Sequence, residues 1–242
     1  MRLPRPRNDP RQYDDLAGEW WRADGPFAML HWLAEARAAL VPPATEPGAV
    51  LVDVGCGAGL LAPHLRGRGY RHVGVDLVRS ALEQAASHGV TPVVGHASAL
   101  PLADASADVV VAGEILEHVT DLGTTVAELC RVLRPGGRLV LDTLNDTPVS
   151  RLLAVGLAER MPRAPRGIHD PALFVDPARL TRLCAGHGVR LEVRGIRPTV
   201  PAVAGWLAGR RPVPGRRRIV PFASTAVLYQ GRGVKRQEKS VM

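Results

Sequence analysis

Val50-Leu51-Val52-Asp53-Val54-Gly55-Cys56-Gly57-Ala58-Gly59 is the stretch that decides the fold. Its first five residues are almost continuously apolar, which is typical of a strand buried on both faces of a parallel sheet. Three glycines within five positions follow, so the backbone turns tightly and a ligand can approach it where no Cβ intervenes. A helical apolar pattern resumes from Leu60 to Arg66. This strand, glycine loop and helix together place a ligand at the carboxyl end of the strand.

The spacing of the glycines argues against a dinucleotide. A G-x-G-x-x-G fingerprint would need its third glycine at position 60, which is Leu60. A second apolar stretch ends in Asp76, seventeen residues after Gly59, where a carboxylate can accept hydrogen bonds from both ribose hydroxyls. Together with Asp53 before the glycines, this combination resembles the S-adenosylmethionine loop of the class I methyltransferases. An ordinary glycine-rich turn between a strand and a helix is the alternative.

Strand and helix patterns alternate along most of the chain. We expect strands at residues 50–54, 71–76, 92–95, 108–112, 138–142, 189–193 and 224–229, and helices near residues 59–67, 79–88, 121–133 and 176–187. Such alternation favours βαβ units. The expected fold class is α/β: a Rossmann-like class I methyltransferase fold with a mainly parallel seven-stranded sheet and helices on both faces.

Three regions flank or interrupt the expected domain. Residues 1–47 should form an N-terminal arm, mobile over residues 1–10, and a helical cap, and residues 48–230 the methyltransferase domain. Within it, residues 147–170 break the alternation with an apolar stretch flanked by arginines, which predicts an inserted helix or lid. The region between Arg197 and Arg218 is rich in Pro and Arg and should be a loop with a short helix at residues 203–207, and residues 231–242 a disordered basic tail.

The net charge of +8 is distributed unevenly. Residues 194–242 hold eleven Lys and Arg against one Glu, whereas residues 1–193 have a net charge of −2. This asymmetry favours an anionic surface nearby, either nucleic acid or acidic lipid headgroups, with a solvated basic tail as the alternative. Three scattered cysteines offer no disulfide framework or metal spacing, and no apolar run approaches the length of a membrane span. We therefore expect a cytoplasmic protein.

The segment after the fourth expected strand holds candidate metal ligands. Glu114, Glu117 and His118 stand at i, i+3 and i+4, so one helical turn would put them on a common face. Two carboxylates and an imidazole can bind a divalent cation, and oxygen-rich ligation suits Mg²⁺ or Mn²⁺ more than Zn²⁺. Such a cation could hold a catechol-like substrate and lower the pKa of the reacting hydroxyl. The alternative is a segment with no metal, since similar sequences occur in class I methyltransferases that need none.

A narrower resemblance emerges from several motifs spread between Tyr13 and His187. The motifs are Trp20-Trp21, Leu30-His31 with Arg37, the glycine loop, Glu114-Ile-Leu-Glu-His-Val119, Arg134-Pro-Gly-Gly137, Thr143-Leu-Asn145 and Gly167-Ile-His-Asp170. Together they resemble the O-methyltransferases of ubiquinone biosynthesis. The resemblance implies an S-adenosylmethionine-dependent enzyme that methylates a phenolic or catechol hydroxyl of a quinone precursor or similar lipophilic small molecule. Its rate would depend on alignment of donor and acceptor and on a deprotonated acceptor oxygen.

The resemblance also implies a set of site residues. Arg37 would meet the methionine carboxylate and Asp76 the ribose, with Gly113 beside the methionine moiety. Glu114, Glu117 and His118 would be the catalytic residues and would hold Mg²⁺. The stretch after the third strand would line the adenine, where His96 replaces a frequent Asp and leaves Ala97 and Ser98 as contacts. The cofactor-binding residues implied in this way are Arg37, Asp53, Gly55, Gly57, Gly59, Asp76, Leu77, Ala97, Ser98 and Gly113.

The insert and the C-terminal region leave alternatives open. In the family the insert is associated with membrane contact, and an apolar helix flanked by arginines at residues 150–167 could lie peripherally on the anionic inner face of the cell membrane, or serve only as a lid. The basic, Pro-rich C-terminal part departs from the family's usual ending, so a specialised-metabolite acceptor remains open. An RNA methyltransferase is disfavoured because no basic patch is interleaved with aromatics. A non-catalytic binding protein is disfavoured by the intact glycine loop, and the sequence does not set the oligomeric state.

Overall fold

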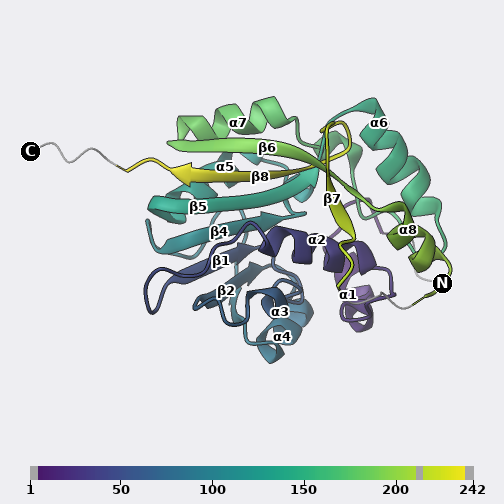
Figure 1. The fold of residues 1–242 in the computed structure, drawn as a ribbon, viewed down its shortest axis with the longest axis horizontal. Helices are drawn as coiled ribbons and strands as arrows, with labels where there is room; N and C mark the ends of the chain where they lie inside the picture. The colour runs from purple at the N-terminus through teal and green to yellow at the C-terminus, as the bar shows by residue number, and fades with distance from the viewer. Residues whose placement is uncertain (1–4, 211–214, 238–242) are drawn as a thin grey trace, which may run out of the picture.

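A single mixed sheet of eight strands organises the computed structural model, which describes residues 5–210 and 215–237 (Figure 1). The strand order is β3-β2-β1-β4-β5-β8-β6-β7. The strands are β1 (Val50–Val54), β2 (Arg71–Asp76), β3 (Thr91–Val94), β4 (Ala107–Gly113), β5 (Leu133–Leu144), β6 (Val189–Pro198), β7 (Ile219–Phe222) and β8 (Leu228–Lys235).

Helices precede, connect and interrupt these strands. The α-helices are α1 (Arg11–Asp15), α2 (Ala28–Ala38), α3 (Ala62–Leu65), α4 (Arg79–Ser87), α5 (Leu122–Val132), α6 (Pro148–Ser150), α7 (Pro177–Gly186) and α8 (Val200–Leu207). Short helical turns are η1 (Ala17–Glu19), η2 (Leu116–His118), η3 (Arg151–Leu157), η4 (Ala158–Arg160) and η5 (Pro171–Leu173), of which η3 is a π-helix. Helices α6, η3 and η4 make up the inserted segment. Helices α1, η1 and α2 make up the cap.

The directions of the strands indicate where a ligand would bind. β1 pairs in parallel with β2 and β4, β2 with β3, and β4 with β5. The last three strands pair antiparallel, β8 with β5 and β6, and β7 with β6. The chain turns from one side of β1 to the other between β3 and β4, and ligands of open α/β sheets bind outside the carboxyl ends of the strands at such a switch point.

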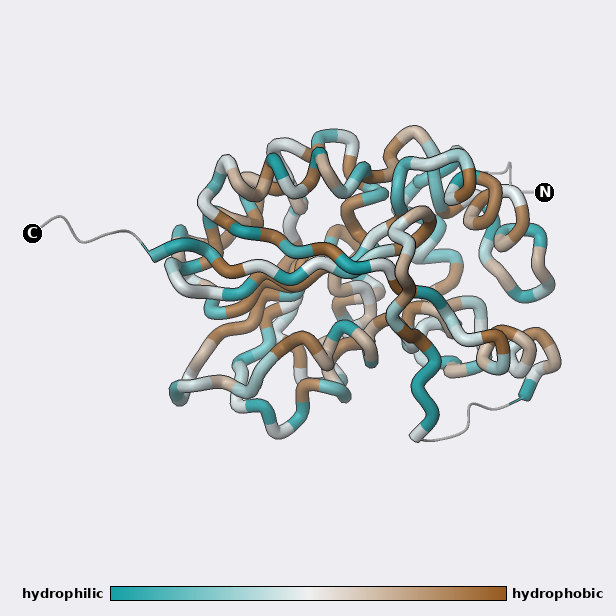
Figure 2. Tube along the Cα trace, turned by 45° about the horizontal axis from the view of Figure 1, so that its top comes forward, coloured by the Kyte–Doolittle hydropathy of each residue, from teal (hydrophilic) through white to brown (hydrophobic). Residues whose placement is uncertain are grey.

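Alternate residues of the central strands face two separate layers of helices. Leu51, Val109 and Val111 pack with residues of α2 and α3 on one face. Val52 and Val110 pack with α5 and α7 on the other face. Because both faces are covered, the central strands are rich in apolar residues, and Figure 2 shows brown segments in the middle of the molecule.

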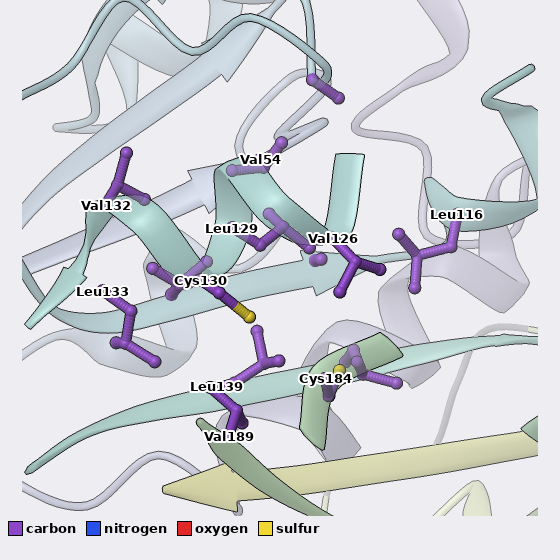
Figure 3. Close-up of a cluster of buried hydrophobic side chains, with 14 of the residues drawn as sticks. Val54, Leu116, Val126, Leu129, Cys130, Val132, Leu133, Leu139, Cys184 and Val189 are labelled. Carbon is purple, nitrogen blue, oxygen red and sulfur yellow. The ribbon is translucent and has the colours of Figure 1, made fainter. Parts of the chain in front are cut away.

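The larger of the two layers joins α5 and α7 to the sheet. Figure 3 shows Val126, Leu129 and Cys130 of α5 near Cys184 of α7, over Leu139 of β5. Cys130 and Cys184 are buried free thiols. They therefore pack as small apolar side chains in the core.

The mainly parallel sheet is confirmed, but it has eight strands, not the seven predicted. The additional strand is β7, an edge strand that within residues 5–210 and 215–237 pairs with β6 alone. Its Pro221 lacks an amide donor, and the arginines before it resemble a loop, so the pattern did not predict a strand. Proline is tolerated there because one side of an edge strand has no partner strand.

The predicted disordered tail at residues 231–242 is wrong for residues 231–235. Gly231 to Lys235 form the end of β8, which lies between β5 and β6. A Cβ at Gly231 would lie 2.8 Å from the side chain of Leu141, so the crowded position requires glycine. The backbone N–H of Arg236 donates to the backbone oxygen of Gly188 (2.9 Å), and residues 238–242 of that prediction lie outside the described residues. The short helix predicted at residues 203–207 is confirmed within α8.

Candidate active site

One cavity of about 840 Å³ opens at the carboxyl ends of β1, β2 and β4. Its wall combines residues from the cap, the glycine loop, the inserted segment, and the β6, α8 and β7 region. Most of the lining side chains are apolar, and the acidic and arginine side chains among them are Arg37, Asp53, Asp76, Glu114, Glu159 and Arg197. Such a cavity, with few polar groups in a mostly apolar wall, has the character of a small-molecule site.

The glycine loop after β1 forms the part of the wall nearest the sheet. Gly55, Gly57 and Gly59 have φ values of +70°, +50° and +80°, which side chains with a Cβ rarely adopt. A Cβ at Gly55 would lie 2.7 Å from Ile115, and one at Gly57 2.7 Å from the ring of Trp20. The loop is therefore packed closely between the cap and the segment after β4.

Two carboxylates flank this loop. Asp76, at the end of β2, accepts hydrogen bonds from the backbone N–H groups of Gly57 (2.8 Å) and Val78 (2.9 Å). Burial raises its pKa, and these two N–H groups act in the opposite direction. Asp53 is also buried and lies 3.4 Å from the Nε2 of His72. Asp76 retains acceptor capacity toward the cavity, because an ionised carboxylate can accept about four hydrogen bonds.

A buried ion pair crosses the site behind Gly113. Arg37 of α2 donates from Nε (2.8 Å) and Nη2 (2.6 Å) to the carboxylate of Asp142 on β5. Burial alone lowers the pKa of Arg37, but the adjacent Asp142 carboxylate outweighs it and the pKa is raised. A Cβ at Gly113 would lie 1.8 Å from the Cζ of Arg37, so only glycine allows the guanidinium to take this place. Arg37 remains charged and reaches the cavity wall.

The expected common face of Glu114, Glu117 and His118 does not form. Glu114 has φ +51° and precedes the helical turn η2, which begins only at Leu116. Its carboxyl lies near Asp142 and Arg37, and burial followed by the charges of Glu117 and Asp142 raises its pKa. The helical spacing could not predict this, because a left-handed residue redirects the chain at the end of β4.

Glu117 and His118 instead meet His169 of the segment after the insert. The three side chains each offer a ligand atom, and these atoms all lie within 4.8 Å of one another. Glu117 is completely buried and accepts a hydrogen bond from the hydroxyl of Thr143 (2.7 Å). The rings of His118 and His169 stack with their centroids 5.4 Å apart.

Residues 5–10, predicted as a mobile arm, are anchored over this cluster. Arg7 donates to the carboxylate of Glu159 (2.8 Å) and to the backbone oxygen of His169 (2.6 Å). The side-chain Nδ2 of Asn8 donates to the backbone oxygen of His118 (2.9 Å). Its backbone N–H donates to the backbone oxygen of Gly167 (3.0 Å). Sequence reasoning missed these residues, since a short polar segment gives no signal for contacts made more than a hundred residues away.

Comparison with known proteins identifies the family to which the chain belongs. A family model described as a methyltransferase domain matches residues 52–141. The ubiquinone biosynthesis O-methyltransferase of Hahella chejuensis is 35% identical over 196 residues, covering 77% of this chain and 82% of that protein. The enzyme of the same name from Xanthomonas axonopodis is 38% identical over 186 residues, covering 73% and 78%. The chain belongs to this family of S-adenosylmethionine-dependent O-methyltransferases.

Solved structures agree on the fold of the methyltransferase. A Thermotoga maritima S-adenosylmethionine-dependent methyltransferase, described as a possible histamine N-methyltransferase, aligns with a TM-score of 0.66 at 19% identity. The alignment covers 93% of this chain and 99% of that one. A methyltransferase from Aquifex aeolicus aligns with a TM-score of 0.56 at 14% identity, covering 93% and 97%. At such identities the likeness shows the fold alone.

The predicted site residues of the methyltransferase divide into two groups. Ten lie on the cavity wall: Arg37, Asp53, Gly55, Gly57, Asp76, Leu77, Ala97, Gly113, Glu114 and His118. Three others do not line it: Gly59 faces Ala85 of α4, Ser98 bonds to the Nδ1 of His96 (2.7 Å), and Glu117 is buried behind the wall. The half-exposed Leu77 beside Asp76 fits a surface that a bound adenosine would cover.

The wall fits S-adenosylmethionine in its chemistry. The backbone at Gly55 and Gly113 lies on the cavity wall, and Asp76 offers free acceptors for ribose hydroxyls. Arg37 uses two of its five N–H donors on Asp142 and presents a positive charge suited to the methionine carboxylate. The donor set therefore matches both ends of the cofactor.

Proposed function

We propose that this methyltransferase methylates a phenolic hydroxyl of a lipophilic quinone precursor or a closely similar small molecule. The observation that supports this most directly is the apolar continuation of the cavity. Beyond the polar groups near β1 and β4, its wall is formed by Leu153 and Leu157 of the insert, Val203 and Trp206 of α8, and Ile196 of β6. An acceptor with a long apolar substituent would be desolvated by such a wall.

The chain's own residues have separable parts in this reaction. When bound, S-adenosylmethionine supplies an electrophilic methyl group on its sulfonium centre. Arg37 and Asp76 would fix the two ends of the cofactor, and Gly113 would leave room for the guanidinium of Arg37 at the end of β4. The apolar wall would exclude water and orient the acceptor, so that much of the rate comes from alignment of the two reacting atoms.

We also propose that the insert and α8 face an anionic membrane. Leu152 and Leu157 of η3 and Val200 of α8 are 59%, 48% and 71% exposed, and Arg151 and Arg160 flank the η3 and η4 segment. Among residues 5–210 and 215–237, no helix has the length and apolar character needed to cross a bilayer. Peripheral binding through exposed apolar side chains next to arginines is the arrangement that this surface supports.

The experiment for the acceptor is methyl transfer from S-adenosylmethionine to matched pairs of catechols and phenols, with and without a prenyl substituent. We expect the prenylated member of each pair to be methylated with a higher kcat/KM than the member without a prenyl group. Turnover of polar metabolites in preference to these phenols would instead support a specialised-metabolite acceptor. Parallel reactions with Mg²⁺ and with a chelator test the predicted cation, and vesicle co-sedimentation with and without anionic lipid tests the membrane face.

A further inference from the structure

The cluster of Glu117, His118 and His169 differs from the ligand set that the sequence motif implied. Two of its members come from the turn after β4, and the third comes from the segment that follows the insert. Their ligand atoms lie within 4.8 Å of one another, a separation that one metal ion can bridge. Glu114, in contrast, turns toward Asp142 and Arg37 and is absent from this group.

Glu117 has one oxygen without a partner. Its Oε2 accepts the hydrogen bond from Thr143, whereas its Oε1 is buried and has no hydrogen-bond partner among the described residues. The side chain is completely inaccessible to solvent, so water from outside does not compensate. A buried, unsatisfied carboxylate oxygen is costly, and a cation at this oxygen would remove the cost.

His118 has its ring orientation fixed by Asn8. The Nδ2 of Asn8 donates to the backbone oxygen of His118, which sets the direction of the amide group. The amide oxygen then lies 2.6 Å from the Nδ1 of His118 and can only accept, so Nδ1 carries the proton. The lone pair of the imidazole is therefore on Nε2, and a ligating histidine typically donates its other N–H in this way.

His169 is held beside it by the N-terminal segment and the insert. Arg7 donates to its backbone oxygen, and its Nδ1 lies 3.8 Å from Oε1 of Glu159, which is itself paired with Arg7. Within the part of the chain that the structure describes, the Nδ1 of His169 has no hydrogen-bond partner. Both histidines line the cavity, and Glu117 lies behind them.

We propose that Glu117, His118 and His169 bind one divalent transition-metal ion at the wall of the acceptor cavity. Two imidazole nitrogens and one carboxylate form a borderline donor set, which favours Mn²⁺, Fe²⁺, Co²⁺ or Zn²⁺ over Mg²⁺. Three protein ligands leave positions open toward the cavity. The proposal deepens the proposed function, on which the metal's role at an acceptor oxygen rests, but binding of the ion can be measured without turnover.

The site would also link the insert to the core. His118 follows β4, whereas His169 follows η4 and is tethered through Arg7 and Glu159. An ion bound by both histidines would hold the cavity wall together across these segments. Metal binding should therefore protect residues 158–170 from hydrogen exchange.

The test is titration of the metal-free full-length protein with Co²⁺, followed by its visible absorption bands, and displacement by Zn²⁺. We expect one ion per chain, and His169→Gln should weaken Co²⁺ binding at least about tenfold. Asn8→Ala should weaken it by about tenfold through loss of the hydrogen bond to His118. Glu114→Gln is the matched control and should bind Co²⁺ as the wild type does.

Wild-type Co²⁺ affinity in His169→Gln, or loss of binding in Glu114→Gln, would overturn the proposal. Circular dichroism and S-adenosylmethionine binding show whether each variant is folded. Methyl transfer to phenols is scored separately in the same preparations. Co²⁺ binding without phenol turnover counts against the proposed acceptor and leaves the metal site supported, whereas turnover with no bound ion under any condition counts against the site.

Discussion

The residue with the least room to change is Gly113. Its missing Cβ leaves the space that the guanidinium of Arg37 occupies, since a Cβ there would lie 1.8 Å from Cζ. We predict that Gly113→Ala displaces Arg37 and lowers kcat/KM by a factor on the order of 100, because a shift of about 1 Å in a positioning group can have that effect. Steady-state kinetics and calorimetric binding of S-adenosylmethionine measure the loss.

Gly123→Ala is the matched control for this change. Gly123 lies in the first turn of α5, and a Cβ there meets only the Oδ1 of Asp121 at 3.4 Å. Its kinetics should equal those of the wild type. Equal kinetics in Gly113→Ala as well would show that Arg37 can move without consequence.

Glu114 is a second residue whose environment has a measurable consequence. It combines a left-handed backbone with a buried carboxyl whose pKa is raised by burial and by the charges of Glu117 and Asp142. We predict that Glu114→Gln raises the free energy of unfolding at pH 7 by about 1 kcal/mol while it lowers activity. Denaturant unfolding in the presence of a chelator is the measurement, and Glu83→Gln on the exposed side of α4 serves as the control.

Equal or reduced stability in Glu114→Gln would show that Arg37 already compensates the carboxylate. The sequence predicted that Glu114 belongs near the site but not its orientation. Spacing of i, i+3 and i+4 describes a common face only where all the residues are helical, and Glu114 is not. Likewise, the sequence offered His169 only as part of the Gly167–Asp170 motif, because Glu117 and His118, which it meets in the fold, are about fifty residues away.

At the scale of elements, the sequence predicted buried strands best. β1 and β2 have the predicted bounds, because both faces are covered and the apolar run ends where the cover ends. β7 and the second half of β8 were not predicted, because Pro221, Gly231 and Gly233 are unfavourable strand residues in isolation. Their places are set by neighbours far away in the chain, such as Leu141 against Gly231.

A charged pair on helix α5 anchors the loop that follows β3 and lines the cavity. Glu128 of α5 pairs with Arg131 (2.6 Å) and accepts from the backbone N–H of Leu100 (2.7 Å). Arg131 in turn donates to the backbone oxygens of Leu100 (3.0 Å) and Leu102 (2.8 Å). This pair therefore anchors the segment that follows Ala97 on the cavity wall.

We predict a pH-dependent stability from this anchor. The hydrogen bond to Arg131 lowers the pKa of Glu128 below its ordinary value of 4.5. The unfolded chain thus takes up the proton first as the pH falls, so the contribution is complete well above pH 4.5 and is lost below it. Glu128→Gln should lower the free energy of unfolding at pH 7 by about 1 kcal/mol and reduce the loss between pH 5 and pH 3.

Urea unfolding of both proteins across that pH range is the measurement. Glu83→Gln, which removes a carboxylate from exposed helix surface, provides the control for net charge. An acid dependence that is the same in Glu128→Gln and in the wild type would place the acid-labile contacts elsewhere.

At the scale of the whole molecule, the cavity exists because four regions of the chain meet. Trp206 of α8 donates from Nε1 to the backbone oxygen of Gly25 in the cap (3.0 Å), and Arg218 pairs with Glu35 of α2 (2.9 Å). These contacts join the basic C-terminal region to the cap. The basic C-terminal region is thus part of the cavity wall.

The apolar space gives the last prediction. Ala154 of η3 lines the cavity and packs with the cluster that includes Phe174 and Ile196, whereas its neighbour Leu152 is 59% exposed and does not line it. We predict that Ala154→Trp fills part of the apolar space and lowers kcat/KM for a prenylated phenol by about tenfold or more, with little change for the same phenol without its prenyl group. A bulky side chain added to a well-packed wall excludes the longer ligand because the backbone yields only at a cost of about 1–3 kcal/mol.

Leu152→Trp places the same indole on the outer side of the same helix, where we expect both acceptors to keep their wild-type kinetics. The comparison separates occupancy of the cavity from general disturbance of the insert, since both variants change one turn of η3. If Ala154→Trp slows both phenols equally, the insert acts on the reacting atoms and not on the prenyl group. If neither phenol is affected, the apolar space does not hold the acceptor, and the proposed substrate class loses its main structural support.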